Sequence, residues 1–181
     1  RPDAPEQARL KRGRDAEVPL SVSLHEAVHG SERHIEVQMG SEKHEITVRV
    51  PAGIESGKKL RVAKRGEEGP GGAGDLLLVV TVEADPRFER RGADLYTIGK
   101  IPPSTLLLGG GVEVETFDGM RTLKIESGTP SSRMMRIRGA GVPRMGGEGR
   151  GDLYVRLEIS VPLNLSEAQL AAGRMLRDAG L

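Results

Sequence analysis

The chain has 181 residues, and its 27 Lys and Arg nearly balance its 26 Asp and Glu, which leaves a formal net charge of +1. This balance provides no overall field that would attract a nucleic acid. The absence of Cys excludes disulfides and cysteine-based zinc sites. No apolar run approaches the about 20 residues of a membrane-spanning helix. We therefore expect one or two small domains, and the repeat described below favours two.

The first half of the chain has the apolar pattern of β-strands. Strands with one buried face are predicted where every second residue is apolar, over 18–24, 35–39 and 46–50. A hairpin-like loop separates the last two of these strands. A short strand is expected at 60–62, and the continuous apolar run at 76–82 is typical of a strand that is covered on both faces.

The second half repeats this order after a short hinge at 85–93. Strands are predicted at 112–114, 123–125, 135–137 and 153–161. The last segment has a helical period instead. Ser166 and Gln169 form a capping-box pattern, Leu165 and Leu170 stand where a hydrophobic staple would, and Gly180 can end the helix.

An internal duplication relates the two halves. Matching positions are separated by 75 residues for the glycines and by 77 for the aspartates, as seen for Gly53 and Gly128, Gly66 and Gly141, and Asp75 and Asp152. A repeat of this length is a whole small β-domain rather than a solenoid unit. The predicted fold is therefore all-β, with two tandem β-sandwich-like subdomains related by duplication and a short C-terminal helix.

Residues 25–29 read His-Glu-Ala-Val-His, which matches the zinc-protease pattern. In that pattern two His one helical turn apart bind zinc and the Glu activates water. The preceding strand pattern and the glycine that follows leave room for only about one turn, and the twin segment 103–109 has neither His nor Glu. A duplicated structural turn is the favoured interpretation. A zinc hydrolase that uses His25, Glu26 and His29 is the alternative.

Neither a cofactor nor a resident metal is expected. Residues 69–74 fit the glycine pattern of dinucleotide-binding loops, but a strand follows them where that site requires a helix. The twin loop at 146–151 also leads into a strand. Without a catalytic constellation, the sequence predicts a binding module rather than an enzyme. A purely structural β-repeat protein, such as a capsid or adhesion module, is a third interpretation.

A group of motifs extends over about residues 17–165. They are found at 22–30, 50–54 with Gly57, 74–76, 88–96, 109–110, 117–119, 141–143 and 151–155. In this order they resemble the C-terminal client-binding region of DnaJ-type J-domain co-chaperones, the forty-kilodalton heat-shock proteins. Asp85 stands where that family usually has His. The Leu-x-Glu-Ala-x-x-Gly turn of the family accounts for the zinc-protease lookalike.

The resemblance implies a division of the chain and a set of partners. It implies a linker remnant at 1–16, a client-binding subdomain I at 17–85, a subdomain II at 86–163 and a C-terminal dimerisation helix at 164–181. The gap between Met39 and Ile46 has no Cys, which indicates the zinc-less subtype. The implied protein is a cytoplasmic V-shaped homodimer that holds unfolded polypeptides and acts with a DnaK-type ATPase. A domain upstream of this chain is also expected.

Three sets of site residues follow from the resemblance. Client peptides are expected to bind a hydrophobic depression of subdomain I, formed by Val18, Leu20, Ile35, Val37 and Leu78. Val18 and Leu20 alternate in phase, as do Ile35 and Val37, so each pair can share a face beside which an extended peptide could add, and any of the five residues can instead belong to the core. The DnaK-type partner is expected to contact Arg33 and Lys43. Dimerisation is expected to involve Leu170, Ala172 and Leu176, although the helix can equally pack on its own domain.

Overall fold

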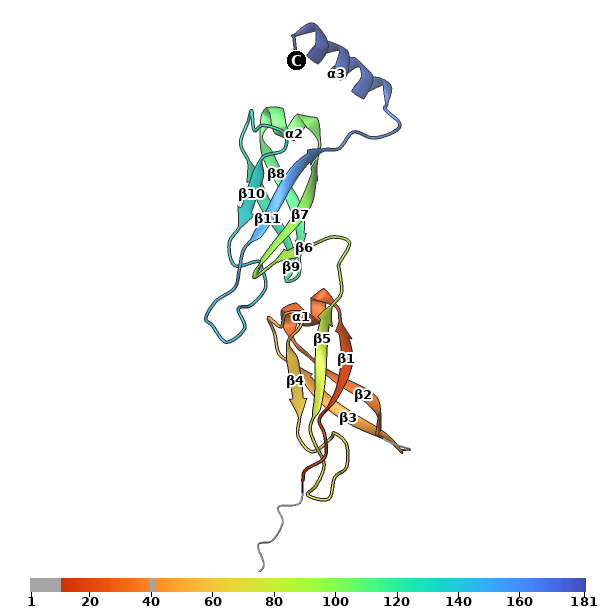
Figure 1. The fold of residues 1–181 in the computed structure, drawn as a ribbon. Coiled ribbons are helices and arrows are strands. Elements are labelled where there is room, and N and C mark those ends of the chain that lie inside the picture. Colours follow the sequence, from red (N-terminus) through yellow and green to blue (C-terminus); the bar gives the residue numbers. More distant parts are fainter. Residues whose placement is uncertain (1–10, 40–41) are drawn as a thin grey trace, which may run out of the picture.

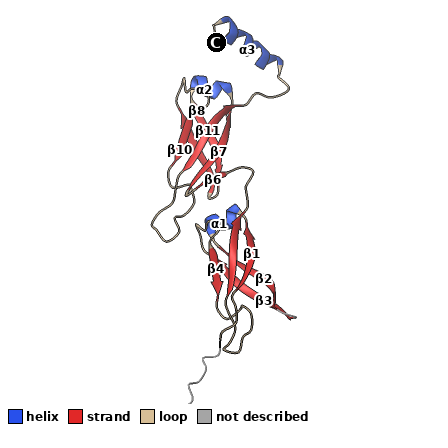
Figure 2. Ribbon diagram, in the orientation of Figure 1, coloured by secondary structure: helices blue, strands red, loops and turns tan. Residues whose placement is uncertain are grey.

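The computed structural model describes residues 11–39 and 42–181, so most of the predicted linker lies outside the described residues. Strands dominate both halves, and helices are short (Figure 2). The first half consists of β1 (Ala16–Val22), α1 (Leu24–His29), β2 (Ser31–Met39), β3 (Glu42–Val50), β4 (Lys59–Val62) and β5 (Leu76–Val82). The predicted strands are found here, although β1 ends at Val22 because Ser23 caps α1.

The first half is a sandwich of a three-stranded sheet and a hairpin. The sheet has the order β1-β5-β4, with β1 parallel and β4 antiparallel to β5, and the hairpin pairs β2 with β3. Because inward side chains alternate with outward ones, the inner faces of both layers fill a single core. The buried members of this core are Leu20, Val22, Ala27, Val37, Ile46, Val48, Val50, Ile54, Leu76, Leu78 and Val80.

The second half repeats the arrangement and adds one strand. It consists of β6 (Glu89–Arg91), β7 (Asp94–Ile101), α2 (Pro103–Leu108), β8 (Gly110–Thr116), β9 (Gly119–Ile125), β10 (Met134–Ile137) and β11 (Leu153–Ile159). Its sheet has the order β10-β11-β7-β6, and β8 pairs with β9. The extra strand β6 lies in the segment that the sequence predicted to be a hinge. The all-β fold with two sandwich-like halves and a short C-terminal helix is confirmed.

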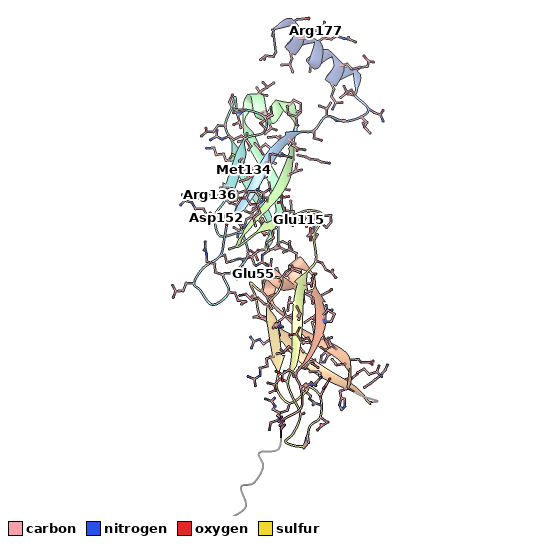
Figure 3. All side chains as sticks on the ribbon, viewed as in Figure 1. Glu55, Glu115, Met134, Arg136, Asp152 and Arg177 are labelled. Carbon is pink, nitrogen blue, oxygen red and sulfur yellow. The ribbon has the colours of Figure 1, made fainter. Side chains whose placement is uncertain are left out.

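The duplicated aspartates hold equivalent turns in the two halves. Asp75 accepts a hydrogen bond from the Lys64 backbone N–H at 2.9 Å, and Asp152 accepts one from the Gly139 N–H at 2.9 Å. Arg136 lies beside Asp152 at 3.6 Å, and both are labelled in Figure 3. The Asp75 side chain is almost fully buried, whereas that of Asp152 is 24% exposed. The first copy of this turn is therefore more tightly enclosed.

The glycine before each aspartate permits a close backbone approach. A Cβ atom on Gly74 would lie 2.0 Å from the Arg14 carbonyl oxygen, and one on Gly151 would lie 2.0 Å from the Ala93 carbonyl oxygen. Residues 11–15 run along this loop in the first half, where the Glu67 N–H donates to the Arg14 carbonyl at 2.9 Å. This part of the predicted linker is therefore hydrogen-bonded to the first half.

The two halves meet end to end through α1 (Figure 1). Leu24 and Val28 of α1 are buried in the core of the second half, not in that of the first. From the second half, the Arg90 guanidinium donates hydrogen bonds to the carbonyls of Ile54 at 2.6 Å and Gly53 at 3.0 Å. The junction is therefore built from buried apolar contacts together with backbone hydrogen bonds.

The C-terminal helix α3 (Glu167–Asp178) stands away from the second half (Figure 1). Ser166 caps it through the predicted capping box, in which the Gln169 N–H donates to the Ser166 hydroxyl at 3.2 Å. Every residue from 160 to 181 is exposed. Within the described residues, no helix combines the length and the apolar character needed to cross a membrane.

Candidate functional site

The first candidate site consists of the unpaired edges of β1 and β2, which we call the first seam. Within the described chain, β1 pairs only with β5 and β2 pairs only with β3, so each strand has one unpaired edge. Both strands lie along the same side of the first half in Figure 1. Val18 of β1 and Ile35 of β2 are half-buried and pack against the core of the first half. They form the apolar rim of the first seam.

The other three residues predicted to contact a peptide lie deeper. Leu20 and Val37 are each 5% exposed and Leu78 is 0% exposed, so all three belong to the core of the first half. Alternation placed Leu20 and Val37 on the inner face of their strands, but the opposing layer covers them, and it covers Leu78 as well. They therefore lie in the core beneath Val18 and Ile35. Of the five predicted residues, these two are the ones that expose apolar surface. A direct client contact by the five residues stays a prediction.

The two edges of the first seam differ as templates for an added strand. The Ala16 N–H donates to Asp75 and the Glu83 N–H donates to Val22, so the backbone groups of even-numbered β1 residues face β5. The backbone groups of odd-numbered β1 residues therefore face the unpaired edge. One of these residues is Pro19, which has no N–H to donate. The β2 sequence contains no proline. An extended peptide is therefore better matched to β2.

The second half has an equivalent opening, the second seam, between β7 and β8. A cavity of about 810 Å³ lies there, and its lining includes Glu115 and Met134, which Figure 3 labels. Strand β6 covers the β7 edge only from Asp94 to Tyr96. The Ser160 N–H donates to Ile101, so odd-numbered β7 residues face β11, and the backbone groups of Ile98 face the cavity. Sequence reasoning missed this site, although the duplication was the signal for it.

The second seam has an apolar floor and a charged rim. Phe88 and Val114 are buried in the floor, and Ile98 is 50% exposed at the rim. A hydrogen bond from the Arg87 side chain lowers the pKa of Asp85. Arg87 also pairs with Glu115 across the seam. Acids and bases alternate around the opening, so this site does not favour a ligand of one charge.

The two residues predicted to contact a partner chaperone are not brought together. Arg33 pairs with Glu26 at 2.8 Å, and Lys43 pairs with Glu36 at 3.2 Å. Lys43 lies opposite Gln38 in the hairpin, five residues from Arg33, which corresponds to about 16 Å along a strand. Arg33 lies on the inner side of β2 and Lys43 on the outer face of the hairpin. The two side chains therefore cannot contact the same short acidic segment from one side of the hairpin.

The zinc-protease lookalike is a structural turn. Glu26 accepts a hydrogen bond from the Ser23 N–H at 2.9 Å, which completes the capping box of the six-residue helix α1, and it accepts another from Arg33 at 2.8 Å. Burial raises the pKa of Glu26, but these hydrogen bonds outweigh it and lower the pKa to about 2. A general base needs a pKa near the working pH. His29 contacts Asp118 at 3.5 Å across the junction. Nothing in this geometry supports the hydrolase alternative.

The residues predicted for dimerisation do not share one face of α3. Ala172 and Leu176 are four residues apart and lie on the same side, but Leu170 is two residues from Ala172, which rotates it about 200° around the helix. Leu170 occupies the staple position opposite Leu165. Leu170 and Leu176 are each 36% exposed, and no residue of α3 is buried.

Comparison with known families identifies this arrangement. The model of the DnaJ C terminal domain matches residues 16–162, which include both halves and both seams. The chain belongs to the DnaJ C-terminal domain family. Membership is consistent with the sequence motifs described above.

Individual relatives agree with this assignment. The chain is 43% identical over 164 residues to "Chaperone protein DnaJ" of Deinococcus proteolyticus, an alignment that covers 91% of this chain and 50% of the relative. It is 36% identical over 171 residues to "Chaperone protein DnaJ 2" of Thermus thermophilus, an alignment that covers 94% of this chain and 59% of the relative. It is 43% identical over 136 residues to "Chaperone protein DnaJ 2" of Corynebacterium efficiens, an alignment that covers 74% of this chain and 34% of the relative. The chain spans about half the length of the first of these relatives.

Proposed function

We propose that this chain is the client-binding part of a DnaJ-type co-chaperone. It holds exposed apolar segments of unfolded polypeptides, acts in the cytoplasm without catalysis of its own, and passes its clients to a DnaK-type ATPase in the full-length protein. The observation that carries this proposal is the first seam, where an unpaired strand edge runs beside the half-buried Val18 and Ile35. Such an edge is the usual template for binding an extended peptide.

The client pairs with β2, because Pro19 interrupts the hydrogen-bonding edge of β1. Backbone hydrogen bonds are independent of the client sequence, whereas the apolar rim selects clients with an apolar residue at every second position. The second seam binds a second segment of the same client. Two linked sites within one chain raise the overall affinity without any new type of contact.

The test compares added charges on the two sides of the same strand. Val18→Asp places a carboxylate at the rim, and Ser21→Asp places one on the exposed outer face of β1. We expect Val18→Asp to weaken the binding of reduced, carboxymethylated α-lactalbumin about tenfold, corresponding to about 1.4 kcal/mol. Ser21→Asp is expected to leave the affinity unchanged. Circular dichroism is the check that both variants fold. Equal affinities of the two variants would overturn the assignment of the first seam.

We further propose that the C-terminal segment forms a homodimer. None of its residues is buried in the described chain, and Leu163 and Met175 are 101% and 74% exposed. Leu108 on α2 is 80% exposed and stands where the twin helix α1 is covered by the next half. The end of the second half therefore offers a surface that another copy can cover. Removing residues 166–181 should convert a dimer to a monomer in light scattering, and an unchanged mass would contradict this proposal.

The assignment of Arg33 and Lys43 to the DnaK-type partner is kept as a proposal with one change. Because they lie on opposite sides of the hairpin, each contributes to a different contact. Arg33 is preorganised by Glu26, whereas Lys43 is 73% exposed and pairs with Glu36, whose side chain is 60% exposed. Lys43→Ala is therefore expected to weaken partner binding without affecting the stability of the chain.

A further inference from the structure

The opposite side of the first half carries a concentration of positive charge. Five cations lie within eight residues just before, along and just after β4, at Lys58, Lys59, Arg61, Lys64 and Arg65, which we call the basic edge. Lys59 pairs with Glu17, and Arg61 shares the single carboxylate of Asp75 with Arg12. In a chain whose net charge is only +1, this local excess is unusual.

Three of these cations have no carboxylate partner in the described part of the chain. Lys58, Lys64 and Arg65 are exposed, and none of them forms an ion pair with a described residue. Exposed lysines on an edge strand commonly serve to prevent sheet-to-sheet aggregation. That role requires charge on the strand itself, and it does not explain the two cations that follow the strand.

The backbone conformation of Lys64 is the second observation. Its φ angle is 57°, in the left-handed region where a side chain is disfavoured, and its twin in the second half is Gly139 with a φ of 68°. Both residues donate the same backbone hydrogen bond to the duplicated aspartate. Glycine therefore suits this turn, and the first half carries a strained lysine instead. Strain of this kind points to a use for the side chain.

The strand beside these cations can accept another strand. In the described chain β4 pairs only with β5, and the Val80 N–H donates to Lys58, so even-numbered β4 residues face β5. The backbone groups of Lys59 and Arg61 therefore face the open edge. Leu60 and Val62 are half-buried and face the core. A strand added here would meet cations on one face and apolar side chains on the other.

We propose that the basic edge is a docking site for an acidic, extended polypeptide segment that pairs with β4. The segment alternates acidic residues, which lie over Lys59 and Arg61, with apolar residues, which cover Leu60 and Val62. Its acidic end reaches Lys64 and Arg65. This site is separate from both seams, because β1 and β4 are the two opposite edges of one sheet. It does not depend on the client-binding proposal.

The test uses the whole 181-residue chain and a labelled peptide of four Glu-Val repeats with blocked ends, measured by fluorescence anisotropy. Lys64→Gly is the informative variant, because it removes the cation and also relieves the strained backbone. We expect it to bind the peptide at least fivefold more weakly while its thermal midpoint stays equal to that of the parent chain or rises. Arg138→Ser removes an exposed cation from the equivalent turn of the other half, next to Gly139, and it should leave the affinity unchanged.

Four further measurements define the site. The same peptide with Gln in place of Glu should bind at least tenfold more weakly, and raising the salt from 0.05 to 0.5 M should weaken binding of the Glu peptide. Binding should slow hydrogen exchange at the Arg61 amide, because that N–H faces the edge. Val18→Asp should bind the Glu peptide normally, which separates this site from the first seam.

The opposite results would overturn the proposal. An equal loss of binding in Lys64→Gly and Arg138→Ser would indicate diffuse charge attraction rather than a site. Binding of a 20-nucleotide oligothymidine with the same affinity and the same sensitivity to Lys64→Gly would indicate a general polyanion surface. Unchanged exchange at Arg61 in the bound state would exclude strand pairing.

Discussion

Replacing Arg90 by methionine should loosen the junction between the two halves. The Arg90 guanidinium donates hydrogen bonds to Ile54 at 2.6 Å and Gly53 at 3.0 Å, and both acceptors belong to the first half. A hydrogen bond from a charged group contributes about 1.5–3 kcal/mol. Because Arg90 is only half-buried, water can replace part of each bond, and the lower value applies. Two lost bonds at that value amount to about 3 kcal/mol.

This loss has a measurable size in thermal unfolding. For a chain of this length, each kcal/mol shifts the melting midpoint by roughly 2–4 °C, so Arg90→Met should lower it by roughly 6–12 °C. The neighbouring residue provides the control. Arg91 pairs with Glu89 on the surface, where both side chains are well exposed, and such a pair contributes little. Arg91→Met should therefore melt close to the parent chain.

The reasoning would be refuted if the two variants melted at the same temperature. A second measurement distinguishes the junction from the halves themselves. Limited proteolysis should cut Arg90→Met faster than the parent chain at the connection around residues 83–87, since the halves separate more often. Faster cutting distributed evenly over the whole chain would instead indicate that Arg90 stabilises one half internally.

Three other properties can be checked on the same chain. The pKa of Glu26 is about 2 in the folded chain against an ordinary value of 4.5. The ionised carboxylate therefore contributes fully to stability above about pH 4.5, and this contribution is lost as the pH falls towards 2. When the pH is lowered over that interval, the melting temperature of Glu26→Gln should fall less than that of the parent chain. Gly151→Ala should destabilise the folded chain by about 3 kcal/mol or prevent folding, since its Cβ would meet a backbone oxygen. The control Gly147→Ala should melt like the parent chain, because the nearest neighbour of its Cβ would be 3.6 Å away. Met175→Asp should lower the mass measured by light scattering without lowering the melting temperature, because that side chain is exposed in the single chain.

The sequence was most informative where local pattern and structure have the same cause. Alternation of apolar residues located the strands, because one face of each strand is buried. The Ser166 capping box located the start of α3, because its hydrogen bonds are local. The duplicated aspartates marked equivalent turns, because each closes its loop with the same backbone hydrogen bond.

The candidate site was harder to predict because it depends on the opposing layer. Alternation placed Leu20 and Val18 on the same face of β1, but it could not distinguish the covered residue from the one at the rim. That difference arises from the position of the hairpin above the sheet. The second seam was missed for a related reason. The open edge at Ile98 exists only because β6 begins at Glu89, which pairs with Tyr96, and no sequence pattern gives the extent of that pairing.

The burial of α1 in the second half also bears on how the chain is synthesised. The first half leaves the ribosome before the residues that cover Leu24 and Val28 have been made. Burial of each of these side chains is worth about 1.5–3 kcal/mol, and this contribution is withheld until the second half has folded. During that interval the nascent chain exposes an apolar end that can bind to other chains. A protein that we propose protects unfolded clients would then itself pass through an aggregation-prone intermediate each time it is made.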